Sequence, residues 1–164
     1  MSVLRFETAI GTCGVRWSER GITGVSLLDA GAGTREDPPE WVRAAVRDMI
    51  ALLAGEHRDL RGVVLDEEGV DDFRRGVYAA TRAVGPGETA TYGDIARAIG
   101  EPGAARAVGA ALGANPFPIV VPCHRVLAST GALHGFSAPG GIATKRRMLE
   151  IERAPGFTQT SLFA

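Results

Sequence analysis

Hydrophobic positions at the start of the chain fall in short runs with glycines between them. Residues 2–9, 13–17 and 22–28 are rich in Val, Ile, Leu, Phe and Trp, and each run is followed by a glycine within a few positions. Short runs of β-branched and aromatic residues bounded by glycine are typical of strands. The pattern predicts a small antiparallel sheet over the first 28 residues.

The spacing of the hydrophobic residues changes after the loop at residues 30–40. Trp41, Ala45, Met49 and Leu52 recur at helical spacing, and Gly55 follows as a stop signal. Residues 59–69, DLRGVVLDEEG, are apolar in the middle and end in an acidic stretch, and they are predicted to form a last strand before the chain leaves the sheet.

From residue 70 onward the pattern is helical. Phe73, Val77, Ala80 and Val84 mark one face of a first helix. Two more helices are predicted at residues 91–100 and 104–114, separated by Glu-Pro-Gly. A helix, a tight turn and a second helix in this order predict a helix-turn-helix. We therefore place a domain boundary near residue 69.

The helix over residues 104–114 consists almost entirely of Ala, Gly, Val and Leu, and Arg106 is its one charged residue. Reading of base edges in the major groove usually needs several long polar side chains. Two interpretations remain open. The helix packs closely against its neighbours as a structural element, or it enters a DNA groove as a slim helix with Arg106 as its one projecting side chain.

Charge is divided unevenly along the 164 residues, although the net charge is only −1. Residues 1–69 hold eight Lys+Arg and twelve Asp+Glu, whereas residues 70–164 hold ten and seven. This division fits an acidic scaffold joined to a half that meets an anionic partner, but chance would also produce it. Apolar runs are too short to span a bilayer and no secretory signal is apparent, so we expect a cytoplasmic protein.

Two cysteines are present, Cys13 and Cys123, and in the cytoplasm both are expected to be reduced thiols. Neither belongs to a Cys-x-x-Cys pair, and the three histidines show no spacing typical of zinc ligands. We expect no metal site.

The stretch IVVPCHRVLA, residues 119–128, places a thiol, an imidazole and a guanidinium side by side after a predicted buried strand. A thiol becomes a nucleophile when a base or a positive charge favours its thiolate. Neighbours on an extended strand point to opposite faces, so Cys123 and His124 can cooperate only if the chain turns there or a water bridges them. Pro122 favours such a turn. Taken alone, the triplet is better explained by an inert buried cysteine beside a surface histidine.

The surroundings of this triplet carry a family resemblance. TYGDIARAIGEPGAARAVGAALGANPFPIVVPCHRVL, followed by GALHGFSAPGG and MLEIE, resembles the O6-alkylguanine-DNA alkyltransferases over about residues 70–153. The resemblance implies an α+β fold with a ribonuclease H-like N-terminal scaffold (1–69) and a helical, winged-helix-like domain (70–164) that binds DNA and accepts the alkyl group. It implies a monomer that acts on double-stranded DNA containing alkylated bases, by a single transfer to its own cysteine, with base flipping and without a cofactor.

The resemblance also implies roles for single residues. Cys123 would accept the alkyl group, His124 would activate it through a water, Glu152 would orient the histidine, and Asn115 would tie the preceding loop to the helix-turn-helix. Tyr92, Ala105, Arg106 and Gly109 would contact DNA, with Arg106 filling the gap left by the extruded guanine. Tyr92, Val126, Phe136 and Ser137 would line the substrate pocket.

The sequence departs from the family pattern at three places. Phe136 stands where most relatives have tyrosine, and Ala138 and Pro139 intervene before Gly140 and Gly141. Both changes bear on the wall of the substrate pocket. The cysteine and histidine ligands with which some relatives bind zinc in the N-terminal domain are not recognisable.

Two other functions compete with alkyl transfer. One is a lesion-binding protein of the alkyltransferase-like type, which flags damage without reacting, but these proteins have the cysteine replaced. The other is a Cys–His hydrolase, which would need an oxyanion site and a path for water. Cys123 disfavours the first function, and nothing in the sequence points to an oxyanion site for the second.

Overall fold

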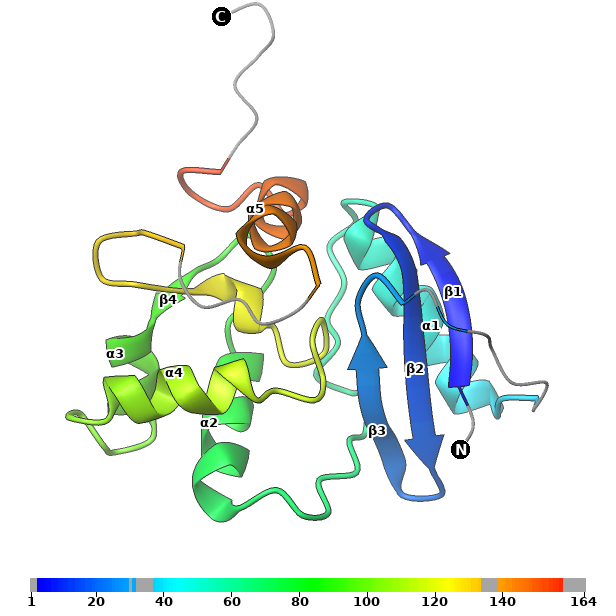
Figure 1. The fold of residues 1–164 in the computed structure, drawn as a ribbon, viewed down its shortest axis with the longest axis horizontal. Coiled ribbons are helices and arrows are strands. Elements are labelled where there is room, and N and C mark those ends of the chain that lie inside the picture. Colours follow the sequence, from blue (N-terminus) through cyan, green and yellow to red (C-terminus); the bar gives the residue numbers. More distant parts are fainter. Residues whose placement is uncertain (1–2, 30, 32–36, 134–138, 158–164) are drawn as a thin grey trace, which may run out of the picture.

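The computed structural model describes residues 3–29, 31, 37–133 and 139–157. An antiparallel sheet and one helix form one side of the molecule, and the remaining helices form the other (Figure 1). Strands β1 (Val3–Thr8), β2 (Gly11–Ser18) and β3 (Gly21–Ser26) pair in the order β1-β2-β3. The three predicted strands are confirmed.

Helix α1 (Glu40–Leu53) packs against the sheet and lies behind it in Figure 1. It buries Ala45, Met49 and Leu52, as predicted, together with Val42 and Val46, whereas Trp41, which was also expected on this face, is 39% exposed. Gly55 follows the helix with a φ of 97°, in the left-handed region that glycine adopts without strain. The predicted helix and its stop are both confirmed.

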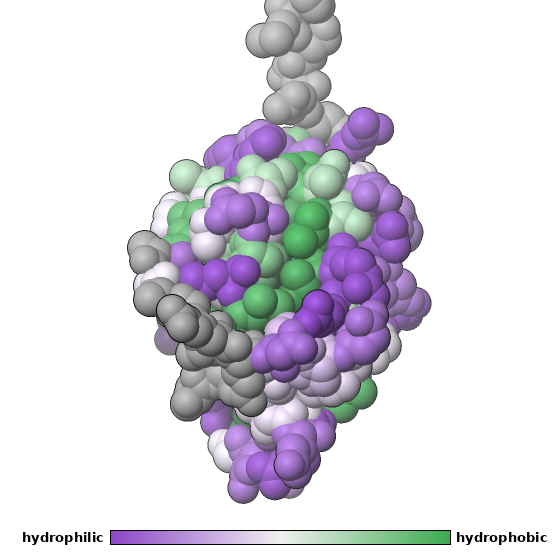
Figure 2. All heavy atoms as spheres, turned by 90° about the vertical axis from the view of Figure 1, so that its right-hand side faces the viewer, coloured by the Kyte–Doolittle hydropathy of each residue, from purple (hydrophilic) through white to green (hydrophobic). Residues whose placement is uncertain are grey.

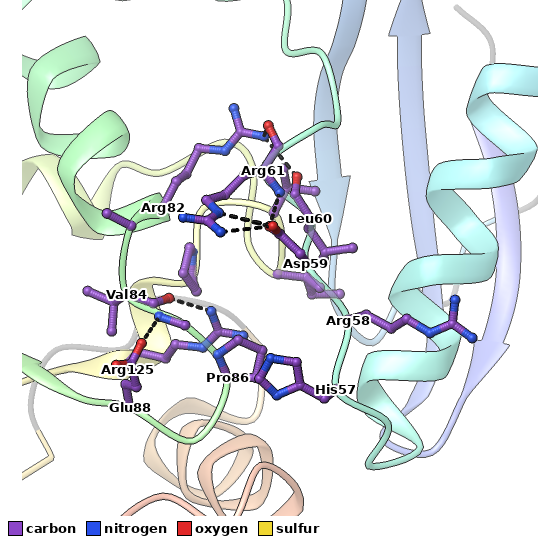
Figure 3. A pocket seen from close by; sticks show the side chains of 15 residues that line it. His57, Arg58, Asp59, Leu60, Arg61, Arg82, Val84, Pro86, Glu88 and Arg125 are labelled. Atoms are coloured by element: carbon purple, nitrogen blue, oxygen red, sulfur yellow. Dashed lines mark hydrogen bonds and ion pairs between the residues drawn. The ribbon is translucent and has the colours of Figure 1, made fainter.

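The predicted strand at residues 59–69 is wrong. Only Leu65 pairs with the sheet, in a single parallel bridge to Ile22. The backbone before it makes a turn, and Arg82 Nη2 donates to three of its carbonyl oxygens, those of Leu60, Arg61 and Val63 (Figure 3). Acceptors that a strand would offer to a neighbouring strand are therefore bound to an arginine from the other half of the molecule.

The predicted helices of the second half are confirmed as α2 (Asp72–Arg82), α3 (Tyr92–Ala98) and α4 (Ala105–Gly113), which pack against one another. The side chains of Asp71 and Thr91 cap the first two helices by accepting hydrogen bonds from backbone N–H groups. Tyr78, buried on α2, donates its hydroxyl to the carbonyl oxygen of Ala111 at 2.8 Å. This buried contact with α2 holds the helix-turn-helix of α3 and α4 in position.

Four further elements of the described residues were not predicted. Strands β4 (Ala90–Thr91) and β5 (Val126–Leu127) form a two-stranded parallel sheet, and helix α5 (Gly141–Ile151) follows. A 3₁₀ turn, η1 (Cys123–Arg125), leads directly into β5. Helix α5 buries Thr144 and Lys145 together with Met148 and Leu149, so half of its buried face is polar.

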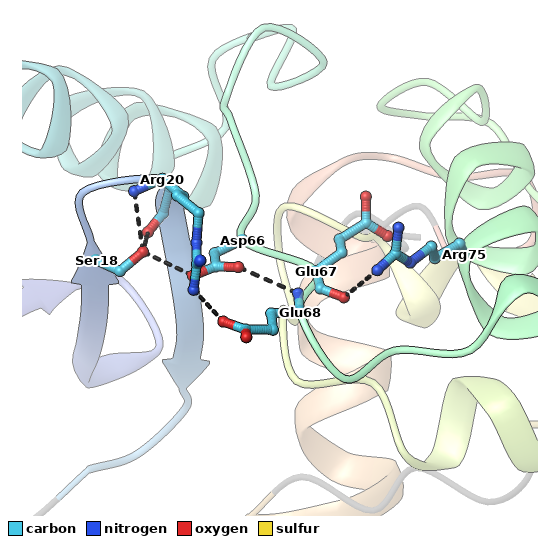
Figure 4. Close-up of polar contacts among 7 residues, drawn as sticks. Ser18, Arg20, Asp66, Glu67, Glu68 and Arg75 are labelled. Carbon is cyan, nitrogen blue, oxygen red and sulfur yellow. Dashed lines mark hydrogen bonds and ion pairs between the residues drawn. The ribbon is translucent and has the colours of Figure 1, made fainter.

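The two halves are joined by the segment before α2. The hydroxyl of Ser18, at the end of β2, donates to Asp66 at 2.7 Å, and Arg75 of α2 donates to the carbonyl oxygen of Glu67 at 2.8 Å (Figure 4). One buried hydrophobic cluster includes Ile22 and Met49 from the first half and Val77 and Phe117 from the second. Within the part of the chain that the structure describes, no helix is both long and apolar enough to cross a membrane.

Candidate active site

The loop before Cys123 is a buried turn, and the strand expected at residues 119–121 is absent. Ile119 has a φ of 75°, which a strand does not allow, and Val121 N–H donates to the carbonyl oxygen of Phe117. Asn115 fixes this turn from both sides. Its Nδ2 donates to the carbonyl oxygen of Val121 at 3.0 Å, and its Oδ1 accepts from Phe117 N–H at 2.9 Å.

The chain turns at the Cys-His-Arg triplet, as cooperation between the thiol and the imidazole requires. Pro122 precedes the 3₁₀ turn, and Arg125 N–H donates back to the carbonyl oxygen of Pro122. Cys123 is partly exposed, whereas His124 and Arg125 are buried. The alternative of a buried, inert cysteine beside a surface histidine is therefore wrong.

His124 contacts Glu152, which follows α5. Its Nε2 lies 2.8 Å from Glu152 Oε1, and neither side chain is more than 3% exposed. A carboxylate accepts hydrogen bonds, so we assign the proton of the neutral ring to Nε2. This leaves a lone pair on Nδ1, which is buried and has no partner among the described residues. Nδ1 is therefore the atom available as a base.

Arg125 binds the same carboxylate in a bidentate manner, through two hydrogen bonds. Its Nε donates to Glu152 Oε2 and its Nη2 to Oε1, both at 2.9 Å. Its Nη1 donates to the carbonyl oxygen of Val84 at 2.6 Å (Figure 3). Burial alone would raise the pKa of Glu152, but His124 and Arg125 outweigh it and lower that pKa to about 2. Glu152 is therefore ionised and fixed in orientation.

Burial shifts the pKa values of both the Cys123 thiol and the His124 imidazole toward their neutral forms. Burial lowers the pKa of His124, against the opposing charge of Glu152, so the ring is neutral at neutral pH. Burial also raises the pKa of the Cys123 thiol, while a hydrogen bond from Asn115 and the charge of Lys145 act in the opposite direction. A neutral thiol beside a neutral base can pass its proton when a substrate is in place.

Lys145 was not predicted as part of the site. It is 1% exposed, its Nζ donates to the carbonyl oxygen of Val126 at 2.8 Å, and it lies 5.9 Å from the centre of the Tyr92 ring. A sequence signal exists in the spacing of Lys145 with Met148 and Leu149, which places all three on one helix face. Without α5 assigned, that face could not be recognised.

The structure brings Tyr92 and Gly109 together beside the cysteine. Tyr92 is the first residue of α3, and a Cβ at Gly109 of α4 would lie 3.8 Å from its ring. Burial and the nearby Cys123 raise the pKa of the Tyr92 hydroxyl. Val126, predicted in the pocket, is fully buried at the start of β5.

The first turn of α4 carries Ala105 and Arg106, and Arg106 is exposed. Its side chain makes no ion pair with any residue in the described ranges. The opposite face of α4 buries Val108, Ala111 and Leu112. The helix is therefore packed on one face, as the structural interpretation predicted, and open on the other.

Phe136 and Ser137, predicted to line the substrate pocket, lie outside the described residues, as does Ala138. Pro139 is described, and its carbonyl oxygen accepts from Thr144 Oγ1 at 2.9 Å. Gly140 has a φ of 86°, and a Cβ there would lie 1.9 Å from the same hydroxyl. Pro139 and Gly140 are thus fixed against α5, at a position that requires glycine.

A thiol, a neutral imidazole and an ionised carboxylate in series, set beside a helix-turn-helix, define a class of DNA-binding protein that carries out covalent chemistry through cysteine. The family model described as 6-O-methylguanine DNA methyltransferase, DNA binding domain, matches residues 72–154, about half of the chain. The chain belongs to this family.

Relatives over the whole chain agree with this assignment. A methylated-DNA–protein-cysteine methyltransferase of Mycobacterium bovis is 46% identical over 125 residues, 76% of this chain and 73% of the relative. One of Mycolicibacterium paratuberculosis is 37% identical over 162 residues and covers 96% of this chain and 95% of its own. The crystal structure of Mycobacterium tuberculosis OGT in complex with DNA superposes with a TM-score of 0.77 at 39% identity, over 94% of this chain and 96% of that one.

The ionised state of Glu152 predicts a pH dependence of stability. Its pKa falls from an ordinary value of 4.5 to about 2 on folding. A carboxylate whose pKa is lower in the folded protein than in the unfolded one stabilises the folded state at pH values above the unfolded pKa. This contribution, on the order of 3 kcal/mol, should be lost as the pH falls from about 4.5 to 2. In urea unfolding at several pH values, the gap in stability between wild type and Glu152→Gln should narrow across this window. A gap that stays constant would mean that Glu152 is not held ionised.

Proposed function

We propose that this protein repairs DNA by transferring an alkyl group from O6 of guanine to Sγ of Cys123, in a single irreversible step. The observation that supports this proposal most is the buried His124–Glu152–Arg125 network, whose histidine and arginine follow the partly exposed thiol of Cys123 in one 3₁₀ turn. The names of the relatives, which state a cysteine methyltransferase acting on methylated DNA, support the same reaction.

In the proposed reaction, Nδ1 of His124 takes the thiol proton through a water, and Glu152 stabilises the positive ring that results. The thiolate attacks the alkyl carbon, a C–S bond forms, and the bond between that carbon and O6 breaks with its electron pair left on guanine. Guanine takes up a proton at N1 from water, and the His124 ring releases the thiol proton to water, so the protons balance. The thioether is stable, so each chain reacts once. The Lys145 ammonium favours the thiolate, and Asn115 holds the loop that presents it.

The proposed DNA-binding surface is the open face of the α3–α4 helix-turn-helix, within a winged-helix-like domain of residues 70–164. Arg106, exposed and without an ion pair to any described residue, fills the space of the extruded guanine. The small residues Ala105 and Gly109 permit close approach to the DNA backbone. Tyr92 and Val126, with Phe136 and Ser137, form the pocket for the flipped base.

Residues 1–69 are the proposed scaffold, of ribonuclease H-like type. Their contribution to repair is to hold the second half in position, because Val25 N–H donates to the carbonyl oxygen of Pro116 in the loop that leads to the cysteine. We propose that the protein works in the cytoplasm.

The test is a titration of a duplex that contains one O6-methylguanine with increasing protein, followed by digestion to nucleosides and chromatography. The proposal predicts conversion of O6-methylguanine to guanine in a one-to-one ratio with protein. Binding without conversion would indicate a lesion-binding protein. Conversion of many equivalents per chain would indicate a hydrolase, because a hydrolase regenerates its thiol.

Truncation of Arg106 should separate base flipping from chemistry. Flipping costs a few kcal/mol, so Arg106→Ala should slow repair in duplex DNA by roughly tenfold or more. The same variant should react with free O6-benzylguanine at nearly the wild-type rate, since the free base needs no flipping. Arg106→Lys should recover only part of the loss, because an ammonium does not stack between bases as a planar guanidinium does.

Single-turnover rates on both substrates decide this prediction. Arg47→Ala is a matched control, because Arg47 is also exposed but lies on α1 in the first half of the chain, where it pairs with Glu40. An equal loss on duplex and free base for Arg106→Ala would show that Arg106 only supports the fold. No loss on either substrate would remove it from the mechanism.

A further inference from the structure

The N-terminal half carries an apolar groove that the repair chemistry does not use. Trp41 at the start of α1 is 39% exposed and Val64 is 60% exposed, and both line one hollow of about 540 Å³ together with Ala44. The side of the molecule that carries β1 and α1 likewise shows hydrophobic surface bordered by hydrophilic side chains (Figure 2). A groove of this volume accommodates side chains of a bound peptide.

The rim of this groove is acidic. Glu19 and Asp48 lie on it, and Glu19 has no ion-pair partner within the described part of the chain. Among the described residues, Arg20 is the one arginine that lines the groove itself, and it is already paired with Asp66 and Glu68 (Figure 4). The groove therefore presents uncompensated negative charge.

A further carboxylate on the rim, Asp59, is neutralised by Arg61, which lowers its pKa to about 2. Asp48 shares Arg58 with Glu56, and the Arg58–Asp48 contact is long, at 3.4 Å. Glu19 and Asp48 are thus the two carboxylates that a ligand would meet.

We propose that this groove binds a protein segment in which a lysine or arginine stands beside an aliphatic residue. An exposed indole attracts an ammonium or guanidinium over its face, and carboxylates at the rim supply the counter-charge. The alkyl stem of the cationic side chain would lie on Val64 and Ala44 while its head reaches Glu19 and Asp48. DNA is an unsuitable occupant because the rim carboxylates repel phosphates.

The position of the groove supports a protein partner. It lies in the half that holds eight Lys+Arg and twelve Asp+Glu, and its lining comes entirely from residues 19–64. None of these residues belongs to the helix-turn-helix or to the Cys123 site. A partner could therefore be bound while the second half contacts damaged DNA.

The indole N–H signals of Trp17 and Trp41 in a ¹H–¹⁵N spectrum provide the test, with Trp17 on β2 as the internal reference. The probe is a short capped peptide of alternating leucine and lysine. We expect it to shift the Trp41 signal saturably and leave the Trp17 signal in place. Matched peptides with glutamate for lysine, or serine for leucine, should bind at least about tenfold more weakly.

Variants locate the site on the groove. Glu19→Gln and Asp48→Asn should each weaken the peptide roughly two- to fivefold, as expected for exposed charge pairs, and Val64→Ser should weaken it without unfolding the chain. Glu101→Gln, an exposed carboxylate in the other half, should have no effect. A Trp41 signal that does not move at millimolar peptide, or equal binding of the glutamate peptide, would overturn the proposal. The proposal would also be overturned if sedimentation showed that the wild-type protein is a dimer and that Val64→Ser makes it a monomer, because a second copy of the chain would then occupy the groove.

Discussion

Cys123→Ser should leave the protein folded and able to bind DNA but unable to accept an alkyl group. A hydroxyl has almost no anionic form at neutral pH, whereas a thiol beside a base supplies a thiolate, so transfer should fall below detection. The open face of α4 is unchanged, so affinity for a duplex should stay within about twofold of wild type. Single-turnover transfer and fluorescence anisotropy measure the two properties separately.

The matched control for this variant is Cys13→Ala. Cys13 is fully buried in β2, and its Sγ lies 3.8 Å from Thr8 Oγ1, away from the histidine and the carboxylate. This variant should retain transfer at the wild-type rate with at most a small loss of stability. Transfer by Cys123→Ser near the wild-type rate, or loss of transfer in Cys13→Ala, would show that Cys123 is not the acceptor.

The largest effect on stability is expected for Arg125. Arg125→Met removes both hydrogen bonds to Glu152 and the one to the carbonyl oxygen of Val84. Removing one partner of a buried ion pair leaves a charge without compensation, so the free energy of unfolding should fall by about 3–5 kcal/mol. Urea unfolding measures it. Arg147→Met, at an exposed arginine of α5, should change stability by less than about 0.5 kcal/mol.

The double variant Arg125→Met with Glu152→Gln identifies the cause. Because the uncharged glutamine no longer needs a buried counter-charge, the double variant should be at least as stable as Arg125→Met alone. A double variant less stable than the single one, by the full cost of both changes, would show that Arg125 acts through packing rather than through the carboxylate.

The elements with regular periodicity could be predicted from the sequence. The three strands follow from short apolar runs bounded by glycine, and α1 and α2 follow from apolar positions at helical spacing. Helices α3 and α4 follow from the Glu-Pro-Gly break that separates them. Helix α5 could not be predicted in this way. Its buried positions include Thr144 and Lys145, so the face it turns inward is not an apolar stripe.

Two predicted strands failed because their backbone groups bind side chains. Arg82 takes the carbonyl oxygens around residues 60–63, and Asn115 takes that of Val121. Such contacts join residues far apart or fold the chain back locally, and a hydrophobic run does not reveal them. The same limit applies to β4 and β5, two-residue strands that pair across 36 positions, from Ala90 to Val126.

Of the candidate site, the triplet Cys123–His124–Arg125 suggested its chemistry but not its geometry. Only the structure shows that a 3₁₀ turn buries His124 and that Arg125 and His124 share one carboxylate, Glu152. The roles of Tyr92, Arg106 and Asn115 came from the family resemblance. Lys145 could not be recognised, because its burial depends on a helix that the pattern does not predict.

The most direct test of the central claim is the mass of tryptic peptides after reaction with a duplex that contains O6-methylguanine. Trypsin separates the two cysteines, because Cys123 lies in the peptide of residues 107–125 and Cys13 in that of residues 6–16. The proposed function predicts that peptide 107–125 gains the mass of one CH₂ on its cysteine, to one equivalent per chain, while peptide 6–16 is unchanged. An unmodified 107–125 peptide after O6-methylguanine has been lost from the DNA, or the added mass on Cys13, would contradict it.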